Sequence, residues 1–428
     1  MLRNKHIYTS NIRRYNTDMN DKKRICEDKI KHLLKLFPAV VVIGARQTGK
    51  TTICKKILPD WFYLDLENPK DYDRITYDPL FFFEQYPRNL IIDEAQEHPD
   101  IFKVLRGIID QKRSIKGRFL LTGSSSPKLL SHLSESLAGR IAIVELDTFK
   151  TIEYHNRPLG NLYNIFSNKL SLKNISEIIP SLELVNINKS WLCGGYPEPT
   201  LSNDESFYLS WMENYRKTYI ERDISKLFPK LNKVAYRRFL QILASLSGNI
   251  INKAALARDI EVSEKTISEY LHIAEGTFLW RLIPSYEKNT RKSIIKMPKG
   301  HFRDTGLLHY LLNIVTENDL MTNTIIGRSF ESFVTEELLK GLNSTSITNW
   351  YPYYYRTRNG AEIDLILEGN FGTLPIEVKY GKYTKLKYLR TLSKFIDEHQ
   401  LPFGMLINQA DSVEWLTPKI IQIPVGAI

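Results

Sequence analysis

The chain has 428 residues, of which 43% are hydrophobic and 25% charged, and its 59 basic and 48 acidic residues give a formal net charge of +11. This length predicts about two to four domains, and the composition excludes a disordered chain. The basic excess favours a polyanionic partner, although a solvated basic surface would give the same count. The three cysteines are too few and too scattered for a disulfide framework or a thiolate zinc site, and no apolar run reaches membrane-spanning length. We therefore expect a cytoplasmic protein.

The first elements precede any candidate site. Residues 1–28 are basic and are expected to form a flexible lead. Ile30, Leu33, Leu34 and Phe37 then recur at helical spacing, which predicts an amphipathic helix.

A phosphate-binding loop follows an apolar, β-branched run at 40–43. The sequence G-x-x-x-x-G-K-T begins at Gly44, and its glycines would let backbone N–H groups surround phosphate oxygens at a helix N-terminus. Lys50 would reach the β- and γ-phosphates of ATP, and the Thr51 hydroxyl would bind Mg²⁺. An ordinary strand–turn–helix is the alternative, but both flanking elements are present here. The expected nucleotide-binding residues are Gly44, Ala45, Arg46, Gln47, Thr48, Gly49, Lys50, Thr51 and Thr52.

The remainder of the segment 29–150 alternates helices with apolar strands. Strands are predicted at 61–66, 89–93, 118–122 and 140–146, with helices at 51–58, around 81–86 and at 101–109. Such alternation predicts a parallel sheet that is covered on both faces and binds its ligand at the carboxyl ends of the strands.

Two acids end the strand at 89–93. Asp93 would hold Mg²⁺ through its water shell, and Glu94 would polarise the water that attacks the γ-phosphate. Thr122 and Ser124, at the end of the next strand, could sense the γ-phosphate, although polar residues at a strand end are more often turn formers. Arg140 could stabilise transition-state charge in its own subunit or in a neighbouring one, or it could simply begin the fifth strand.

Beyond residue 150 the strand pattern stops. Residues 151–235 are predicted to be a helical linker or lid, with a variable insertion at 156–190, a rigid turn at 191–199 and a helix over 207–227. Residues 236–312 predict a winged helix, because 252–275 has a helix–turn–helix pattern in which Ser263 caps the second helix. A polar linker is expected near 315–325.

The basic residues of the predicted winged helix favour contact with duplex DNA. Lys265, Thr266, Ser268 and His272 would face outward, while Glu261, Glu264 and Glu269 weaken a DNA-binding face. Between 281 and 303 seven basic residues stand against Glu287 alone: Arg281, Lys288, Arg291, Lys292, Lys296, Lys299 and Arg303. Docking to a protein remains the other interpretation.

The segment 322–428 carries a second acidic pattern. Asp364 lies on one strand of a predicted hairpin, and Glu377 and Lys379 lie on one face of the next strand. This order is typical of restriction-endonuclease-like nucleases, in which the acids hold Mg²⁺ and the lysine activates water. Glu331, from the preceding helix, would complete the metal ligands Glu331, Asp364 and Glu377, with Lys379 catalytic. The alternative is a partly buried ion-pair network without catalysis.

Motifs along most of the chain resemble those of the bacterial and archaeal AAA-superfamily ATPases that are fused to a C-terminal domain of unknown function. The matching stretches are 44–51, 64–67, 91–96, 120–124, 137–140, 194–198, 219–223, 302–306, 362–364 and 377–379. The resemblance implies ATP binding and hydrolysis, names no substrate, and favours Arg140 as an arginine finger, a residue that stabilises charge on the transferred phosphate.

The sequence thus predicts an α/β protein with a parallel-sheet AAA-type P-loop domain, a helical and winged-helix middle and a C-terminal restriction-endonuclease-like α/β domain. The expected function is ATP-driven action on DNA, with a homo-oligomer formed through the ATPase domain. The alternative is a nucleotide-gated regulatory or scaffold protein whose nuclease-like domain only binds.

Overall fold

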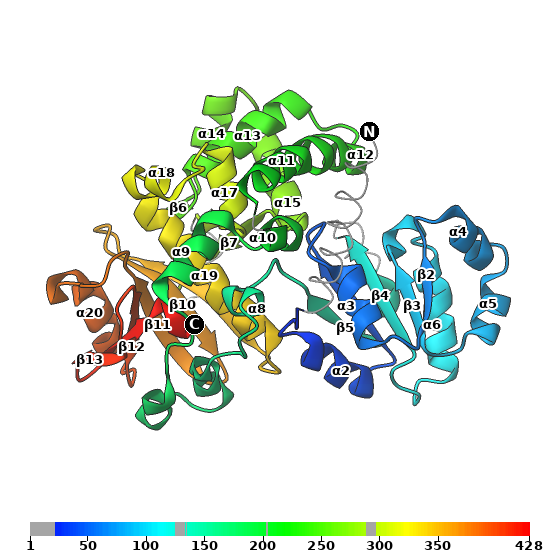
Figure 1. Ribbon diagram of the computed structural model, residues 1–428, viewed down its shortest axis with the longest axis horizontal. Helices are drawn as coiled ribbons and strands as arrows, with labels where there is room; N and C mark the ends of the chain where they lie inside the picture. Colours follow the sequence, from blue (N-terminus) through cyan, green and yellow to red (C-terminus); the bar gives the residue numbers. More distant parts are fainter. Residues whose placement is uncertain (1–21, 125–132, 134, 203, 288–296) are drawn as a thin grey trace, which may run out of the picture. The chain divides into compact units, whose positions relative to one another are not determined.

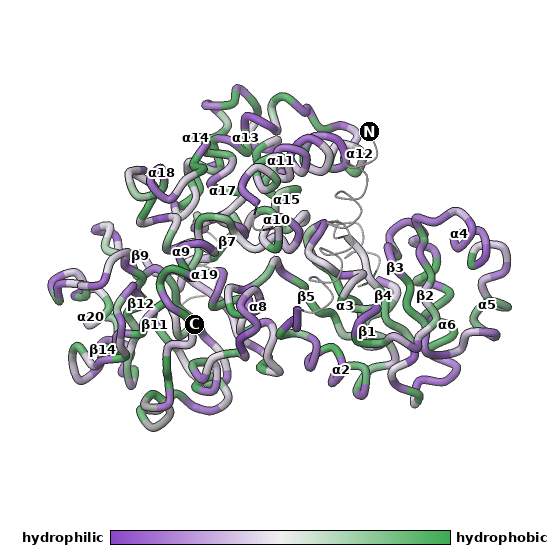
Figure 2. Tube along the Cα trace, in the orientation of Figure 1, coloured by the Kyte–Doolittle hydropathy of each residue, from purple (hydrophilic) through white to green (hydrophobic). Residues whose placement is uncertain are grey.

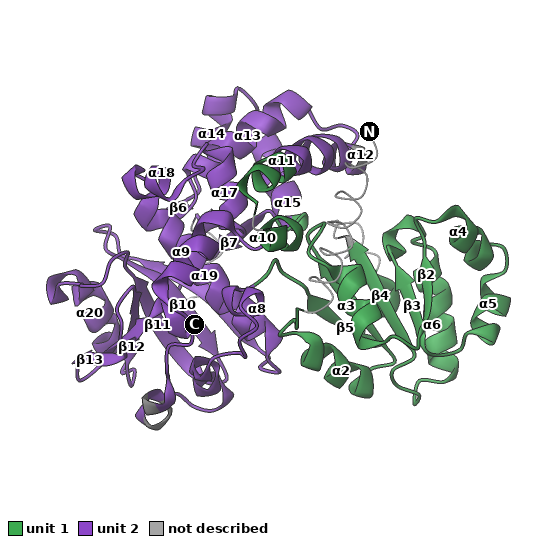
Figure 3. Ribbon diagram, viewed as in Figure 1, with its two compact units in different colours: residues 1–149, 196–211, 276–278 green, residues 150–195, 212–275, 279–428 purple. Residues whose placement is uncertain are grey.

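The computed structural model describes residues 22–124, 133, 135–202, 204–287 and 297–428. Two compact units, shown in Figure 3, divide the chain. Unit 1 comprises residues 1–149, 196–211 and 276–278, and unit 2 comprises 150–195, 212–275 and 279–428. The expected basic lead lies outside the described residues as far as residue 21, and its last two residues begin helix α2 (Glu27–Leu36).

Unit 1 is built on the parallel sheet that the sequence predicts. Its strand order is β2-β3-β4-β1-β5, and every neighbouring pair is parallel (Figure 1). Strand β1 therefore lies between two partners, so that its carboxyl end has neighbours on both sides. The strands are β1 (Ala39–Gly44), β2 (Phe62–Asp65), β3 (Leu90–Asp93), β4 (Phe119–Ser124) and β5 (Ile141–Glu145).

Helices cover this sheet on both faces because its central strands are apolar on both sides. Val40 and Val42 of β1 pack with α2 and α3 (Lys50–Ile57), whereas Val41 and Ile43 pack in a separate cluster with the helices of the other face. Those helices are α4 (Pro69–Thr76), α5 (Pro79–Gln85) and α6 (Ile101–Gln111). Figure 2 lets the hydropathy of these elements be followed along the chain.

The first part of unit 2 is irregular and helical, and it corrects one prediction. The rigid turn expected at 191–199 consists mostly of the end of α9 (Leu184–Cys193) and the start of α10 (Pro197–Ser202), the latter belonging to unit 1. The turn is confined to the residues between them, where Gly194 adopts φ +70° and a Cβ would meet Asp304 Oδ1 at 2.2 Å. The chain also includes α8 (Thr151–Tyr154), 3₁₀ turns at Asn161–Ser167 and Leu172–Glu177, α11 (Glu205–Tyr215), a π-helix at Arg216–Asp223 and α12 (Ile224–Leu227).

The middle of the chain forms three helices and a small antiparallel sheet of order β6-β8-β7. Ser263 Oγ accepts a hydrogen bond from Thr266 N at 3.1 Å, as the cap of the third helix should. The elements are α13 (Lys233–Ser245), β6 (Asn249–Ile250), α14 (Lys253–Ile260), α15 (Glu264–Gly276), β7 (Trp280–Ile283) and β8 (Lys299–Phe302). Helices α17 (Thr305–Leu311) and α18 (Glu317–Thr322) follow, so the expected linker near 315–325 is partly helical.

The C-terminal part has a mixed sheet of order β13-β14-β12-β11-β10-β9. The predicted hairpin is present, because β10 and β11 pair antiparallel. The long helix α19 precedes the sheet and is buried along most of its length. The elements are α19 (Ile326–Ser344), β9 (Trp350–Arg356), β10 (Glu362–Gly369), β11 (Gly372–Val378), α20 (Arg390–Glu398), β12 (Gly404–Asn408), β13 (Glu414–Thr417) and β14 (Ile420–Pro424).

Candidate functional sites

The loop between β1 and α3 has the backbone that its glycines permit. Gly49 adopts φ +90°, and at Gly44 a Cβ would meet the backbone oxygen of Leu146 at 2.2 Å. Gln47, at φ +64°, lies at the tip of the loop. Thr48 Oγ1 donates to Ala45 O at 3.0 Å and closes the turn. Only glycine fits at Gly44 without a shift of the neighbouring chain, so this loop packs tightly against the segment that leaves β5.

Lys50 lies buried inside this loop. Its Nζ donates to Gly44 O at 3.2 Å and to Ala45 O at 2.9 Å, and only 5% of the residue is exposed. Burial lowers the pKa of this ammonium, and the nearby carboxylates Glu94 and Asp93 oppose that effect. The hydrogen bonds of this ammonium thus go to backbone carbonyls, which are partners that phosphate oxygens can replace.

Asp93 collects three hydroxyl groups at the end of β3. Its Oδ2 accepts from Thr51 Oγ1 at 2.7 Å and from the Tyr63 hydroxyl at 2.5 Å, while its Oδ1 accepts from Thr122 Oγ1. The structure thus brings together Thr51 and Asp93, the two residues expected at Mg²⁺. Tyr63, on β2, was not expected here, because an aromatic residue in a short strand carries no signal for such a contact.

Glu94 begins the loop beyond β3 in a left-handed conformation, with φ +51°. Its backbone N–H lies 3.2 Å from Asp93 Oδ1 and 3.3 Å from Thr122 Oγ1, and its carboxylate accepts from Gln96 Nε2 at 2.6 Å. The hydroxyl of the expected sensor Thr122 therefore contacts the Asp93 carboxylate and the backbone N–H of Glu94.

The other expected nucleotide-binding residues surround the loop. Arg46 and Thr52 are partly exposed, and the charge of Arg46 contributes to lowering the pKa of Lys50. Ser124 is paired with Gly44 by strand register, but its side chain lies outside the description.

Arg24 supports the loop from outside the motif, which the sequence did not indicate. Its guanidinium donates to Thr48 O at 2.9 Å and to Asp147 O at 2.7 Å, and it stacks over the Phe149 ring at 4.9 Å. A single buried side chain thus fixes the backbone of the phosphate loop to the chain after β5.

Arg140 lies at the amino end of the parallel strands, whereas the phosphate loop lies at their carboxyl end. It precedes β5, whose first residue Ile141 pairs with Ala39 at the start of β1, whereas the phosphate loop follows the end of β1. Its guanidinium forms two 2.7 Å hydrogen bonds with the carboxylate of Asp110 on α6. This position favours a role at a neighbouring subunit over one at the phosphates of its own subunit.

A second cluster of acids and lysines lies in the C-terminal part of unit 2. Asp364 on β10 accepts from Val378 N at 2.8 Å and lies 3.7 Å from Lys379 Nζ. Lys379 Nζ also lies 2.5 Å from Glu377 Oε1. The structure therefore groups Asp364, Glu377 and Lys379 as the sequence predicts.

Glu331 joins this cluster through a residue that the sequence assigned elsewhere. Lys299, the first residue of β8, contacts Glu331 Oε1 and lies 3.6 Å from Asp364 Oδ1. The Lys299 side chain is only 4% exposed. Within the described part of the chain, no three histidine, cysteine or acidic side chains are placed to hold a metal ion, and the expected metal ligands are instead joined by two ammonium groups.

The acids of the cluster hold protons unusually strongly. Burial raises the pKa of Glu377 to about 8 and that of Glu331 to about 7, and the charge of Asp364 adds to both shifts. Burial alone would lower the pKa of Lys299, but Glu331 and Asp364 raise it overall. The two lysines therefore stay charged, and they lie among more acids than they neutralise.

Other basic residues assigned to the wing also point inward. Arg281 Nε contacts Glu336 Oε1 at 2.5 Å, His301 Nε2 lies 2.8 Å from the same oxygen, and Arg303 Nε lies 3.7 Å from Oε2. Acids of α19 thus form ion pairs with Arg281, Lys299 and Arg303, so these three residues do not form a DNA-binding face. The remaining wing residues, Lys288, Arg291, Lys292 and Lys296, lie outside the described residues.

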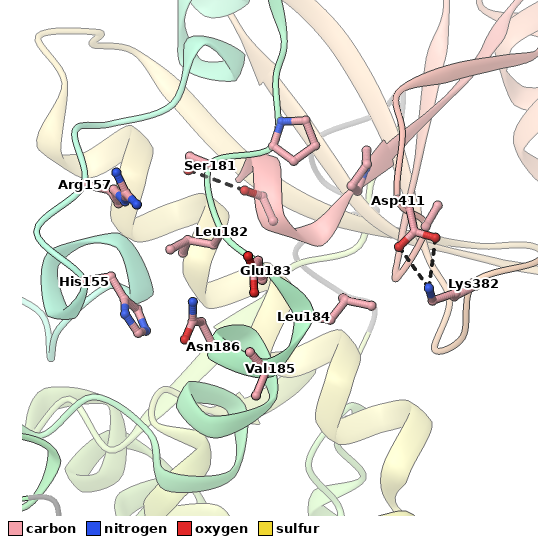
Figure 4. A pocket seen from close by; sticks show the side chains of 14 residues that line it. His155, Arg157, Ser181, Leu182, Glu183, Leu184, Val185, Asn186, Lys382 and Asp411 are labelled. Atoms are coloured by element: carbon pink, nitrogen blue, oxygen red, sulfur yellow. Dashed lines mark hydrogen bonds and ion pairs between the residues drawn. The ribbon is translucent and has the colours of Figure 1, made fainter.

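A polar pocket of about 770 Å³ opens elsewhere in unit 2 (Figure 4). Lys382 and Asp411 on its wall form 2.9 Å ion pairs with each other. The lining includes His155, Arg157, Ser181, Glu183, Asn186, Lys382 and Asp411. Its wall carries both signs of charge, which favours no one class of ligand.

Fold and site together define an ATPase of the AAA kind. Residues 36–155 match the AAA domain family, residues 185–318 match a domain of unknown function (DUF8612), and residues 326–428 match another (DUF4143). Uncharacterized proteins of Mycobacterium tuberculosis and Mycobacterium bovis are 31% identical over 409 residues, covering 95% of this chain and 84% of theirs. The chain belongs to this family of AAA ATPases with a C-terminal DUF4143 domain.

The chain is also similar, at lower identity, to archaeal proteins. An uncharacterized protein of Methanocaldococcus jannaschii is 24% identical over 391 residues, covering 86% of this chain and 81% of that protein. A Walker-type ATPase of Pyrococcus abyssi has a TM-score of 0.42 and 14% identity, covering 67% of this chain and 94% of that one, a likeness too distant to assign a function. No helix among the described residues is long and apolar enough to span a membrane.

Proposed function

We propose that the chain hydrolyses ATP with Mg²⁺ at the β1–α3 loop and uses the nucleotide to control a C-terminal domain that binds without cutting. The contact of Thr51 and Tyr63 with Asp93 supports the nucleotide role, because it prepares one carboxylate at the carboxyl edge of the sheet. The residues fit Mg²⁺, since Thr51 and Asp93 supply the hydroxyl and carboxylate oxygens that this ion prefers.

Each residue of the loop has a distinct task in this proposal. Lys50 leaves the carbonyls of Gly44 and Ala45 and neutralises the β- and γ-phosphates. Bound Mg²⁺ would neutralise charge on the same phosphates. Glu94 breaks its contact with Gln96 and accepts a proton from the attacking water.

The paired lysines of the C-terminal cluster carry the second half of the proposal. A metal-dependent nuclease needs its carboxylates free to bind the ion. Here Lys299 and Lys379 contact all three acids, and Asp364, Glu377 and Lys299 are buried. Such a cluster favours a binding module over a nuclease.

Incubating the wild-type protein with linear, supercoiled and single-stranded DNA tests this half. Reactions contain Mg²⁺ or Mn²⁺, with and without ATP, and Asp364→Asn is the matched variant. We expect ATP turnover from both proteins and cleavage from neither. Cleavage by the wild type that Asp364→Asn abolishes would establish a nuclease and refute the binding role.

Contact with DNA is a second candidate function, and the order of elements in 233–302 favours it. Helix, strand, two helices and a hairpin follow one another as in a winged helix, and Lys265 and His272 are exposed on α15. Neutralising Lys292 and Lys296 should reduce the slope of log affinity against log salt by about two. Lys265→Gln, on the helix itself, should reduce it by about one. Binding that is insensitive to salt would instead indicate a protein partner for this module.

The expected homo-oligomer gives Arg140 its test. If Arg140 acts on a neighbouring subunit, inactive Lys50→Ala and Arg140→Ala proteins should partly restore each other's ATPase activity when mixed. Absence of rescue would leave the Asp110 ion pair as the role of this residue.

A further inference from the structure

Lys299 reaches the acidic cluster from a different part of the fold. The carboxylates stand on α19, β10 and β11, whereas Lys299 begins β8 of the small three-stranded sheet. Its ammonium touches Glu331 and lies 3.6 Å from Asp364, with almost no exposure to solvent. One buried positive charge therefore bridges two carboxylates that come from separate elements.

The charges of the cluster do not balance. When all three are ionised, Glu331, Asp364 and Glu377 supply three negative charges, against the two positive charges of Lys299 and Lys379. Without Lys299 the formal excess would be two negative charges, which is the charge that one divalent cation neutralises.

One oxygen of the cluster also lacks a hydrogen-bond partner. Glu377 Oε1 is held by Lys379, but its buried Oε2 has none among the described residues. Only 6% of Glu377 is exposed, and its carboxyl interacts electrostatically with Asp364 and Glu331. A buried oxygen of this kind is costly unless a ligand can reach it.

We propose that Lys299 is the built-in cation of this cluster, and that its ammonium takes the place of a hard divalent cation between Glu331 and Asp364. Withdrawal of β8 would uncover a site for Mg²⁺ or Mn²⁺, with Glu331, Asp364 and Glu377 as oxygen ligands. This inference rests on the proposed binding role of the C-terminal domain and gives its physical cause.

A second buried lysine, which contacts the same helix α19 from another part of the chain, provides a matched control. Lys150 is as deeply buried as Lys299 and lies 3.1 Å from Glu337 Oε2, which also accepts from Thr151 N at 3.0 Å. In the described part of the chain, Glu337 forms the ion pair with the Lys150 ammonium, and Glu153 Oε2 accepts from the Lys150 backbone N–H at 2.8 Å. Removing Lys150 therefore deletes a buried ammonium of the same kind that pairs with neither Glu331 nor Asp364.

The test measures Mn²⁺ binding, without nucleotide, to the wild type, Lys299→Met and Lys150→Met. A Mn²⁺ site is assigned to the acidic cluster when adding Asp364→Asn to the same protein removes it. We expect Lys299→Met to gain one such site, at least tenfold tighter than any in the wild type or Lys150→Met. Its melting temperature should rise with added MnCl₂, because binding to the folded state stabilises it.

Two results would overturn the inference. The first is a folded Lys299→Met protein that binds no more Mn²⁺ at the cluster than the wild type does. If Lys299→Met does not fold, Lys299→Gln is measured in its place. The other is Mn²⁺ binding at the cluster in the wild type with equal affinity, a measurement that requires no Lys299 variant. DNA cleavage by the wild type would instead refute the proposed binding role.

Discussion

The phosphate loop and the C-terminal cluster both combine buried lysine with acidic side chains, and they differ in what holds the lysine. In the phosphate loop, Lys50 is bonded to backbone carbonyls, and Asp93 is bonded to hydroxyl groups. In the C-terminal cluster, Lys299 and Lys379 are bonded directly to the acids. The first arrangement leaves both charges available to a ligand, whereas the second uses them on each other. Residue types alone therefore do not distinguish a binding site from an ion-pair network.

The largest effect should come from the loop lysine. Lys50→Ala should weaken ATP binding by about tenfold to hundredfold, because a charge-assisted contact with the phosphates is lost, and should abolish turnover. Equilibrium binding of a fluorescent ATP analogue measures the first effect. Lys150→Met, a buried lysine outside the loop, should bind ATP like the wild type, and equal affinity in Lys50→Ala would exclude this site.

Glu94 should separate binding from chemistry. Glu94→Gln should retain ATP affinity and hydrolyse ATP about 10² to 10⁴ times more slowly, because the amide keeps the shape of the side chain but cannot accept a proton. Single-turnover kinetics provide the rate. Turnover equal to that of the wild type would remove Glu94 from the mechanism.

Asp364 should affect stability without affecting ATP turnover. Asp364→Ala leaves Lys299 and Lys379 with fewer partners, and breaking such a buried pair costs about 3 to 5 kcal/mol. The melting temperature should fall while the ATPase rate per folded molecule is unchanged. A melting temperature equal to that of the wild type would contradict a stabilising role for Asp364 in the cluster.

The C-terminal acids should make stability depend on pH in a stated direction. Glu377 and Glu331 have pKa values of about 8 and about 7 in the fold, against 4.5 for an ordinary glutamate. Between these limits the folded chain binds protons that the unfolded chain has lost, so stability falls as pH rises, by on the order of 1 kcal/mol per pH unit. Glu377→Gln should flatten the fall in melting temperature between pH 5 and pH 8, whereas the exposed Glu398→Gln should not. Parallel curves for all three proteins would contradict the assignment.

The sequence predicted that Thr51 and Asp93 lie together because the parts of the first site are local. The loop from Gly44 to Thr51 is contiguous, and the alternation of strands and helices brings Asp93 to the same sheet edge. Tyr63, Gln96 and Arg24 escaped notice because single aromatic, amide and basic residues have no spacing that marks a tertiary contact.

The second site was predicted only in part, for the same reason. Asp364, Glu377 and Lys379 lie on adjacent strands, so their grouping follows from the hairpin. Lys299 was counted among the basic residues of the predicted wing because its partner Glu331 lies on a helix far away in the sequence. A count of charged residues does not show whether a side chain points to solvent or into the protein. The prediction of a rigid turn at 191–199 was wrong for a different reason, because the prolines of this segment are also compatible with the first turn of a helix.

The segment 147–150, which follows β5, is held by side-chain contacts at both of its ends. Asp147 is fastened to the phosphate loop through Arg24, and Lys150 is fastened to α19 through Glu337. The intervening backbone spans at most ~11 Å. We therefore expect ATP to change hydrogen exchange at the Thr151 amide, which is bonded to Glu337, and no change there would mean that Arg24 absorbs the movement of the loop. Residues 147–150 thus run from a bond to the phosphate loop to a bond to α19 within four residues.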